Sequence, residues 1–599
     1  MSATHYKNIL FPKTLFLVLV LVLLPSVAWG VNITKDTTVS SDLTTQHVIT
    51  ADDTTLTVTG SIKYSGSQAV RANSRTNPTV VVNSGATIAT VGTGTDFGIN
   101  LTSSTGATVT NSGTISAVDQ QAVRATSSTN ATITNNAGGV ISAGNNAIFA
   151  ADAGVSGLTI TNSGKIYNTD STVALRLESS SGTTITNNAG GEIYTTGSGQ
   201  AVKLGDSATL TNSGEIRNDT STSNKSIWFV GDDSTVTLKE GSILVGKLEF
   251  DAGATGSTIK VEQGYGQSYF YNTTGTGTYT VEDLSGNAIV KGSAASVGQG
   301  AQETVDERLG LRTFNLRSAL KRYSAFPKNL IEDELYVEPF SYYSKRGSNS
   351  SILSYDNYGY GLNLIYPKSN KLDLILTVEK SELAIQRDHD VSNTNFLAGF
   401  NARDFLSIGS WKASGFFVAG MGWHDGKRRI YTNTTSNGLL DVTSDYTSYE
   451  MIAGSHISHS YSPDDKNTWS TEVGLTFGYS LVGDYEESQF YDWKDRRLLQ
   501  GSIHIGEQLT SKVSDKLTVT VGGELEHRTV LTGREQKYVI NGTGAESKNG
   551  QFWQNSVAGK LGANYSMNNN MVAYVNIDSR FSNLIRGTYG ASVGLKLNF

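Results

Sequence analysis

The chain has 599 residues, a formal net charge of −7, 63 glycines and no cysteine. A chain of this length is expected to form two or more domains. The absence of cysteine excludes disulfides, cysteine-ligated zinc and thiol nucleophiles. Residues 31–300 carry 14 Lys and Arg against 21 Asp and Glu, and residues 301–599 carry 31 against 33. Neither part has the basic excess of a nucleic-acid-binding domain, so nucleic acid is excluded as a partner.

Residues 1–30 predict a secretory signal peptide, because basic residues precede a short apolar run and small residues follow it. We expect cleavage before Val31. The alternative, an N-terminal membrane anchor, is disfavoured because the apolar run is shorter than the about 20 residues that cross a bilayer. Since no later segment is long and apolar, any membrane span must be built from strands. The leader consists of Lys7 and Lys13, the run Leu15 to Leu24, and the cleavage-site residues Ala28 and Gly30.

Residues 31–224 contain a repeat. The motif Thr-(Val/Ile/Leu)-Thr-Asn recurs with spacings of 28, 24, 27, 25 and 25 residues, and a second motif, of the type Gln121-Ala122-Val123, keeps the same period. Two motifs locked in phase predict a solenoid, and short Val, Ile and Thr runs broken by Asn and Gly predict strands. We therefore expect a right-handed parallel β-helix. The repeated asparagines are Asn111, Asn135, Asn162, Asn187 and Asn212, with a looser copy at Asn83.

The repeat also predicts an interior. The apolar residue two positions before each asparagine should stack inside, and the asparagines should form a ladder of amides that hydrogen-bond from turn to turn. The glycine that follows should supply a positive φ. After Asn135 and Asn187 two extra residues precede the next isoleucine. Because strand side chains alternate, an insertion of two keeps that isoleucine inward, whereas an insertion of one would expose it.

In residues 225–300 the repeat degrades and aromatic residues appear, from Trp228 and Phe229 to Tyr279. Terminal repeats of a solenoid are usually atypical because they cover its open end. We interpret this segment as that cap. The alternative is a groove that binds a ligand through the aromatic side chains.

Residues 301–323, within a linker region 301–330, predict the one good helix of the mature chain. Acidic residues lie in its first turns and basic residues follow, as the helix dipole favours. Its apolar stripe is too thin for a hydrophobic core, but suits a polar, charge-lined channel. The basic residues considered for this role are Arg308, Arg312 and Arg317.

Residues 331–599 contain segments of about ten residues that alternate apolar and polar side chains, which is typical of membrane β-barrels. Twelve strands are expected, starting near 335, 357, 372, 395, 409, 446, 468, 498, 517, 552, 571 and 588. Gly, Glu and Asp on the inner side would line a wet lumen. A soluble two-sheet sandwich is the alternative. The last strand is apolar at Tyr589, Val593, Leu595, Leu597 and Phe599.

The order of these segments resembles a monomeric (type Va) bacterial autotransporter, and the resemblance covers nearly the whole chain. It implies that residues 31–224 are a passenger exported to the cell surface through a barrel in the outer membrane of a Gram-negative cell. It also implies that the helix fills the pore afterwards. The implied partners are outer-membrane lipid, the barrel-assembly machinery, which reads the last strand, and periplasmic chaperones. In some members the passenger is cut between two asparagines near the helix, but residues 290–330 hold no Asn-Asn pair.

The passenger offers little chemistry. Gly205-Asp206-Ser207 resembles part of a serine-hydrolase motif, but the mature passenger has a single histidine, His47, far away in sequence, and a catalytic triad needs a base within hydrogen-bond reach. Gly92 to Asp96 resembles a calcium repeat, yet it occurs once. We expect no enzyme, cofactor or metal site. The favoured function is a surface-displayed adhesive or self-associating passenger with host or self ligands. A secreted hydrolase or virulence effector and a diffusion pore are the alternatives.

Overall fold

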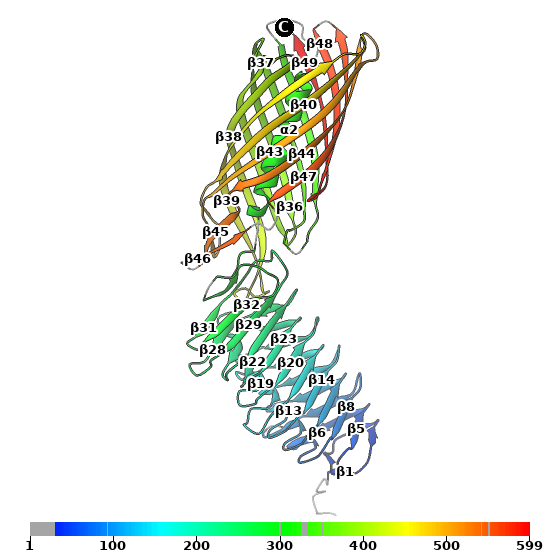
Figure 1. Ribbon diagram of the computed structural model, residues 1–599. Helices are drawn as coiled ribbons and strands as arrows, with labels where there is room; N and C mark the ends of the chain where they lie inside the picture. Colours follow the sequence, from blue (N-terminus) through cyan, green and yellow to red (C-terminus); the bar gives the residue numbers. More distant parts are fainter. Residues whose placement is uncertain are drawn as a thin grey trace, which may run out of the picture. The chain divides into compact units, whose positions relative to one another are not determined.

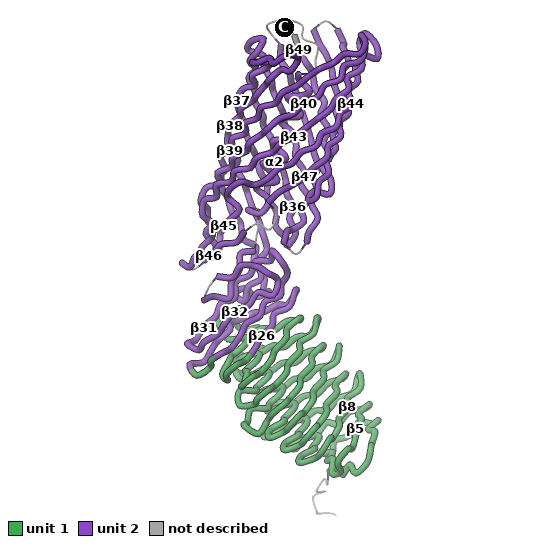
Figure 2. Tube along the Cα trace, viewed as in Figure 1, with its two compact units in different colours: residues 1–234, 253–255 green, residues 235–252, 256–599 purple. Residues whose placement is uncertain are grey.

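The computed structural model describes residues 30–92, 94–290, 292–298, 301–324, 334–349, 351–540, 542–548, 552–568 and 570–598. The predicted leader residue Ala28 and the terminal Phe599 lie outside this set. The chain divides into two compact units (Figure 2), residues 1–234 with 253–255 and residues 235–252 with 256–599. Within the ranges just given, helices of a length and hydropathy suited to crossing a bilayer are absent.

The first unit is a parallel β-solenoid in which each turn contributes one strand to each of three sheets (Figure 1). In every sheet the hydrogen-bonded neighbours come from successive turns, and they run parallel. The first sheet contains β1 (Val31–Ile33), β4 (His47–Ile49), β7 (Gln68–Arg71), β10 (Phe97–Asn100), β13 (Gln121–Arg124), β16 (Asn146–Phe149), β19 (Val173–Arg176), β22 (Gln200–Leu204) and β25 (Lys225–Phe229). The second contains β2 (Thr37–Val39), β5 (Thr55–Val58), β8 (Thr79–Val82), β11 (Thr108–Asn111), β14 (Thr132–Asn135), β17 (Thr159–Asn162), β20 (Thr184–Asn187) and β23 (Thr209–Asn212). The third contains β3 (Asp42–Leu43), β6 (Ser61–Tyr64), β9 (Thr87–Thr90), β12 (Thr114–Ala117), β15 (Val140–Ala143), β18 (Lys165–Asn168), β21 (Glu192–Thr195) and β24 (Glu215–Asn218).

The solenoid interior is built from stacks of aliphatic side chains. Ile133 of β14 lies in register with Val109 and Ile160 of the neighbouring turns, and all three are fully buried. In the third sheet Ile115, Ile141 and Ile166 stack in the same way although the connection before Ile141 is two residues longer than the one before Ile115. The two-residue insertion therefore preserves the inward direction, as parity requires. The predicted parallel solenoid is confirmed.

The glycines after the repeated asparagines serve two different purposes. In the longer Asn-Ala-Gly-Gly connection, Gly138 and Gly190 have φ values of +80°. The prediction of a positive φ is wrong for the shorter connection, where Gly113 and Gly164 are not left-handed. A Cβ on Gly164 would lie 2.2 Å from the carbonyl oxygen of Gly139. In the shorter connection glycine is thus required by the close approach of two backbones.

Substitution of one ladder asparagine tests the interior. Asn162 is fully buried and its Nδ2 donates to Asn187 Oδ1 at 2.8 Å, while it accepts from Asn135 at the same distance. We expect Asn162→Ala to lower the free energy of unfolding of the solenoid by about 2–3 kcal/mol, because it leaves buried amide groups without a partner. Urea unfolding followed by circular dichroism measures this. Thr161→Ala, one position away on the outer side, should change it by less than about 0.5 kcal/mol.

The second unit begins with short strands that include two parallel pairs, β26–β29 and β28–β31. Their apolar residues Val236, Ile259 and Phe250 are buried. Later strands of this segment depart from the solenoid pattern, because β30 pairs antiparallel with β33. The segment comprises β26 (Thr235–Lys239), β27 (Ile243–Val245), β28 (Lys247–Phe250), β29 (Ser257–Glu262), β30 (Tyr269–Tyr271), β31 (Thr273–Gly275), β32 (Tyr279–Asp283) and β33 (Ala294–Ser296). Residues 235–298 are called the cap segment below.

The rest of the second unit is a closed barrel of twelve antiparallel strands with a helix inside it, which confirms the predicted fold (Figure 1). Closure follows from the pairing of the first strand with the last, Leu335 opposite Leu597. The strands are β34 (Glu334–Arg346), β35 (Tyr355–Ser369), β36 (Leu372–Ile385), β37 (His389–Ile408), β38 (Trp411–Thr432), β39 (Leu439–Tyr461), β40 (Asn467–Val482), β43 (Arg496–Lys512), β44 (Leu517–Thr532), β47 (Trp553–Asn568), β48 (Met571–Ser582) and β49 (Ile585–Asn598). Two long hairpin connections form a separate four-stranded sheet of β41 (Tyr485–Glu486), β42 (Tyr491–Trp493), β45 (Glu535–Ile540) and β46 (Thr543–Lys548).

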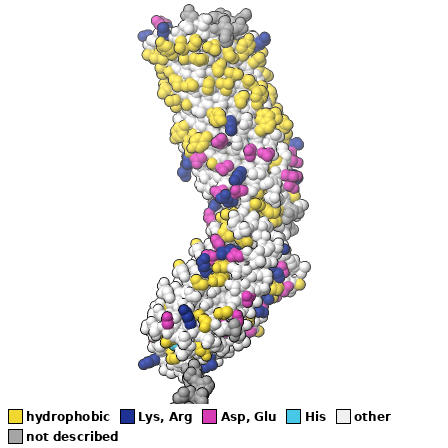
Figure 3. Space-filling view, turned by 180° about the vertical axis from the view of Figure 1, so that it is seen from behind, with side chains coloured by type: hydrophobic (Ala, Val, Ile, Leu, Met, Phe, Trp, Pro, Cys, Tyr) yellow, Lys and Arg dark blue, Asp and Glu magenta, His cyan; other side chains and the backbone are white. Residues whose placement is uncertain are grey.

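The outer face of the barrel is apolar. On β44 the side chains of Val521 and Leu525 are about half exposed, whereas those of Glu524 and Glu526 between and beside them point inward and are buried. Figure 3 shows hydrophobic side chains spread over much of the barrel surface. Of the 42 large hydrophobic residues that are exposed in the described part of the chain, 38 lie at residue 358 or later. Apolar surface is therefore concentrated on the barrel strands.

Candidate functional site

The candidate site is the lumen of the barrel, which a helix occupies. A short 3-10 turn, η1 (Ala301–Thr304), leads into α2 (Val305–Ser324), close to the predicted span of 301–323. Sixteen of the 20 residues of α2 are buried, and these include Asp306, Glu307, Arg308, Arg312 and Arg317. A helix with so many buried charges is stable only where the surrounding wall supplies counter-charges.

Paired acids on the inner face of the barrel hold two of these arginines. Arg312 donates to Glu379, at 3.2 Å, and to Glu450. Arg317 donates in the same way to Glu524 and, at 3.2 Å, to Glu526. All of these side chains are at most 5% exposed. Each arginine therefore bridges two carboxylates on the wall, an arrangement that suits its planar, multidentate guanidinium.

The ends of the helix are fixed by further ion pairs. Near its start, Arg346 of β34 donates to Glu303 at 2.8 Å and to Glu307 at 2.7 Å. Near its end, Arg322 contacts Glu338 at 2.7 Å. Arg308, the third predicted arginine, contacts the ring nitrogen Nδ1 of His424 at 3.2 Å rather than a carboxylate. The helix is thus tied to the wall along its whole length.

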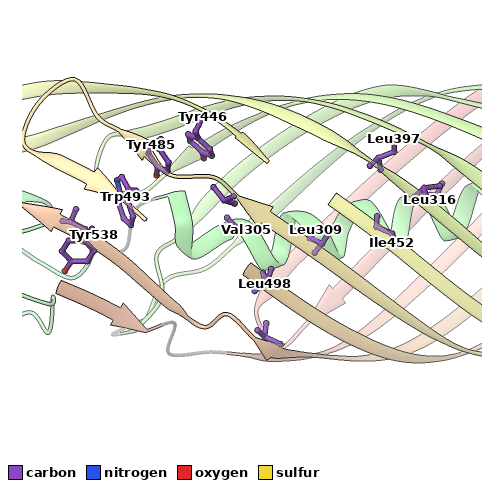
Figure 4. Packing of buried hydrophobic residues seen from close by; sticks show 14 of the residues in the cluster. Val305, Leu309, Leu316, Leu397, Tyr446, Ile452, Tyr485, Trp493, Leu498 and Tyr538 are labelled. Atoms are coloured by element: carbon purple, nitrogen blue, oxygen red, sulfur yellow. The ribbon is translucent and has the colours of Figure 1, made fainter. Parts of the chain in front are cut away.

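Apolar contacts fill the space between these ion pairs. Figure 4 shows Val305, Leu309 and Leu316 of α2 among side chains of the wall. Phe314 lies beneath two cations, with Arg580 and Lys560 each 5.0 Å from its ring centroid. The surrounding residues labelled in that view are Leu397, Tyr446, Ile452 and Leu498 on the barrel strands, and Tyr485, Trp493 and Tyr538 on the four-stranded sheet.

The two ends of the lumen differ. Beside the last turns of α2 lies a polar cavity of about 350 Å³, lined in part by Lys321, Arg403 and Glu472. At the start of the helix a stack of aromatic side chains covers the lumen, with Tyr485 4.3 Å from Tyr446 and 5.9 Å from Trp493 between ring centroids. Gln302 donates to the hydroxyl of Tyr485 at 3.3 Å. The lumen is therefore covered at the end where the helix begins.

The cap segment is bound to this covered end. Strand β30 pairs in parallel with the end of β38, Tyr269 opposite Tyr431. Asn433 acts as a two-pronged clamp, because its Oδ1 accepts from the backbone N–H of Asn272 at 2.7 Å and its Nδ2 donates to the carbonyl of Asn272 at 2.9 Å. Phe270 stacks on Phe490 with ring centroids 4.0 Å apart. The cap segment therefore packs on Tyr431 to Asn433 and on Phe490, and this surface of the barrel unit is called the seat below.

A buried arginine holds the seat together. Arg428 pairs with Glu487 at 2.8 Å and donates to the carbonyl of Val297 and the hydroxyl of Ser268, and it is 4% exposed. Arg428 belongs to the charged run Lys427-Arg428-Arg429 near the end of β38. Strand alternation turns it inward between its exposed neighbours.

Replacement of Arg428 should loosen the cap segment. Arg428→Met leaves the buried Glu487 without its cation, and we expect a loss of about 3 kcal/mol in the local stability of the seat. Hydrogen exchange of residues 268–297 measures this as faster exchange. Arg429→Met is the matched control, because that side chain is 46% exposed and pairs with Asp441 on the surface. Equal exchange in the two variants would contradict the role given to Arg428.

The remaining predicted residues lie elsewhere. Tyr589, Val593 and Leu595 of the last strand point outward and are exposed, and Leu597 on the same side is half-buried. The asparagines Asn111 to Asn212 are fully buried and donate in sequence, each Nδ2 to the next Oδ1, at 2.7–2.8 Å. Gly30 and Val31 stand at the beginning of the described chain. Within the described ranges, groups of three or more His, Asp or Glu suited to a metal ion are absent.

Sequence reasoning missed the acids that receive the helix and the residues of the seat. The signal for the acids is present in the sequence, since Glu379, Glu450 and Glu524 stand at inner positions of alternating strands. Which arginine each acid meets depends on the rotation of α2, which no local pattern encodes. For the seat, the signal is the density of aromatic residues between β40 and β43, among them Tyr485, Tyr491 and Trp493.

Comparison with solved structures finds domains of bacterial autotransporters. The translocator domain of the autotransporter NalP from Neisseria meningitidis matches with 12% identity and a TM-score of 0.40, over 50% of this chain and 100% of that one. The β domain of the Bordetella autotransporter BrkA matches with 12% identity and a TM-score of 0.32, over 45% and 100%. The transport unit of the autotransporter AIDA-I from Escherichia coli matches with 11% identity and a TM-score of 0.32, over 48% and 98%. No protein-family model and no curated protein matches the sequence. At such identities and scores these likenesses assign no function, and the geometry of the lumen and the seat carries the proposal that follows.

Proposed function

We propose that this protein is an outer-membrane autotransporter that exports its own β-solenoid and keeps it on the cell surface. One observation carries the proposal. The chain runs from the cap segment at the covered end of the barrel, through the lumen as α2, to β34 near the other end, where Tyr323 lies against Tyr336 with ring centroids 5.5 Å apart. This is the path of a chain that has been drawn through its own barrel.

The barrel suits a lipid environment. Its outward side chains are apolar, with Val557, Leu561 and Ile577 more than half exposed, and a closed barrel leaves no unpaired strand edge in the hydrocarbon region. The outer membrane is the location proposed for it. The barrel-assembly machinery and periplasmic chaperones are its proposed partners, with β49 as the strand that the machinery recognises.

The seat supports retention of the passenger. The cap segment is held by β-pairing, by the Asn433 clamp and by Arg428, all on the same polypeptide as the barrel. We propose that residues 31–224 stay attached as an adhesive or self-associating surface, and that the division into passenger, cap, pore helix and barrel follows the predicted boundaries at 224, 300 and 330.

A hydrolytic passenger is disfavoured by distance. Asp206 and Ser207 follow β22, whereas His47 opens β4, six strands away in the same sheet. At ~4.8 Å per strand the two sites are roughly 29 Å apart. His47 is also buried, and its Nδ1 contacts the carbonyl of Thr45. A serine nucleophile needs its base within hydrogen-bond reach, so we propose a non-enzymatic function.

Protease treatment of intact cells tests the proposal. The expected result is that a high concentration of protease, enough to degrade even the folded solenoid, removes residues from 31 to about 300 from outside without lysis, while a detergent-soluble fragment beginning near 301 remains in the outer membrane. A chain truncated after residue 330 is the control and should stay inside the cell. Recovery of the mature full-length chain as a soluble periplasmic protein would overturn the proposal.

A further inference from the structure

The first sheet of the solenoid carries an outward column made of cations and aromatic rings. Register places Arg124 of β13 beside Phe149 of β16, and Phe149 beside Arg176 of β19. Lys203 of β22 and Trp228 of β25 continue the same line. The five residues Arg124, Phe149, Arg176, Lys203 and Trp228 occupy five adjacent turns, and they are called the column below.

The side chains of the column contact one another. The guanidinium of Arg124 lies 5.6 Å, and that of Arg176 5.4 Å, from the ring centroid of Phe149. The ammonium of Lys203 lies 4.2 Å from the ring of Trp228, with Lys225 on the same ring at 3.5 Å. All five members of the column are partly exposed. The result is a strip of flat apolar faces bordered by positive charge.

The column carries a net positive charge, although the solenoid as a whole carries a net negative charge. Residues 31–234 carry ten Lys and Arg against 15 Asp and Glu. Glu178 is the acid that meets the column, at 2.8 Å from Arg176 and 3.4 Å from Lys203. No acidic side chain in the described part of the chain pairs with Arg124, whose Nε donates to the hydroxyl of Thr126. Positive charge therefore exceeds negative charge along this strip.

The third sheet provides an internal comparison. It has the same ingredients, because Tyr167 stacks on Tyr194 at 4.8 Å and Arg217 lies over Tyr194 at 4.2 Å. There, however, Arg217 is paired with Glu192, Glu215 and Asp219. The stacked rings of the third sheet, whose arginine is neutralised by acids, are explained by the stability that stacking gives the solenoid. The excess charge of the column needs another explanation.

We propose that the column binds a linear acidic polysaccharide through its carboxylate or sulfate groups. The cations Arg124 and Arg176 are two turns apart, roughly 10 Å at ~4.8 Å per turn. Polysaccharides that alternate an acidic and a neutral sugar carry their carboxylates at such two-residue intervals, and their sugar C–H faces stack on aromatic rings. Guanidinium groups bind carboxylate and sulfate oxygens through paired hydrogen bonds. Nucleic acid fits the column less well, because phosphates follow one another at about 3.4 Å per strand along a duplex axis, whereas Arg124 and Arg176 are roughly 10 Å apart.

The biological role of this binding rests on the proposed surface display. Binding itself depends only on the folded solenoid and can be measured with the purified protein. The test uses the full chain purified in detergent and, separately, cells that express it. Chondroitin sulfate of defined length is the probe, with neutral dextran and single-stranded poly(dT) as comparisons. We expect saturable binding of chondroitin sulfate that weakens as salt is added, and no binding of dextran.

Two variants locate the binding. The double variant R124Q/R176Q should bind chondroitin sulfate at least about tenfold more weakly, because it removes two charge-assisted contacts. The double variant K165Q/R217Q removes the same charge from the third sheet and should bind as the parent does. Phe149→Thr, a β-branched replacement suited to a strand, should weaken binding without a change of charge. Protease resistance of residues 31–224 verifies that each variant is folded.

The possible outcomes are distinct. Absence of binding by the purified chain, or equal loss in both double variants, overturns the proposal. So does poly(dT) binding that depends on the column and matches that of chondroitin sulfate, which would make the ligand a nucleic acid. Column-dependent association between copies of the chain, without polysaccharide binding, would make the partner a second copy. Failure of surface display leaves the binding of the purified chain measurable, so the two proposals fail separately.

Discussion

Arg312→Met should open the barrel. The substitution leaves Glu379 and Glu450 buried at the wall without a counter-charge, and removal of one partner from a buried ion pair costs about 3–5 kcal/mol. The substitution destabilises only the state in which α2 lies in the lumen. The ratio of filled to open barrels should therefore fall by roughly two to three and a half orders of magnitude. The measurement is ion conductance of the purified protein in planar bilayers, where the variant should show frequent large openings and the parent few.

Two further variants make this result specific. Arg497→Met removes an arginine whose side chain is 72% exposed and which pairs with Asp495, so conductance should stay at the parental level. The triple variant R312M/E379Q/E450Q replaces the whole charged cluster with neutral groups and should restore closure, because replacement of a complete buried network is close to neutral. Parental conductance in R312M, or a triple variant as leaky as the single one, would show that these ion pairs do not hold the helix.

Deletion of residues 225–290 should separate insertion from folding. The barrel strands β34 to β49 are untouched, so we expect a heat-modifiable barrel in the outer membrane at normal abundance. Residues 31–224 should become sensitive to protease, because deletion leaves the solenoid without its atypical terminal turns and the seat without the segment it binds. Loss of protection is expected to be nearly complete at a low protease concentration that leaves the parental solenoid intact, and digestion of intact cells followed by mass analysis measures it.

A deletion within the repeat is the matched control. Removal of residues 132–183 takes out two whole turns, β14 to β19, and brings Thr184 to the position of Thr132, which pairs with Thr108. Because every turn presents the same register, the shortened solenoid should remain protease-resistant. If residues 31–224 of the 225–290 deletion variant resist protease as those of the parent do, the cap segment is not needed for folding of the solenoid.

The barrel was predictable because its signal is local. Alternation along one strand, such as outward Leu475 and Phe477 with inward Thr476, is visible in the sequence without knowledge of any neighbour. Strand ends were less accessible. β39 begins at Leu439 and β37 at His389, seven and six residues before the expected starts, because these strands extend into polar hairpins where alternation fades.

For the lumen and the seat, the sequence predicted the polar character of the channel but not which residues pair within it. The thin apolar stripe of α2 correctly indicated a polar channel, since Arg312 and Arg317 alone meet four glutamates of the wall. The identity of those acids depends on contacts over as many as 209 residues of sequence separation. Likewise, the inward turn of Arg428 follows from the register of β38, but its partners Glu487 and Val297 come from other segments.

The pairing of β30 with β38 has a mechanical consequence. A tether that pulls on the solenoid away from the membrane loads the strand pair and the Asn433 clamp first, and the ion pairs of α2 stand behind them along the same covalent chain. Backbone hydrogen bonds in one place and buried guanidinium–carboxylate bridges in another thus act as successive anchors under tension. Under the proposed adhesive function, tension on the solenoid would therefore reach the barrel through these two anchors in turn.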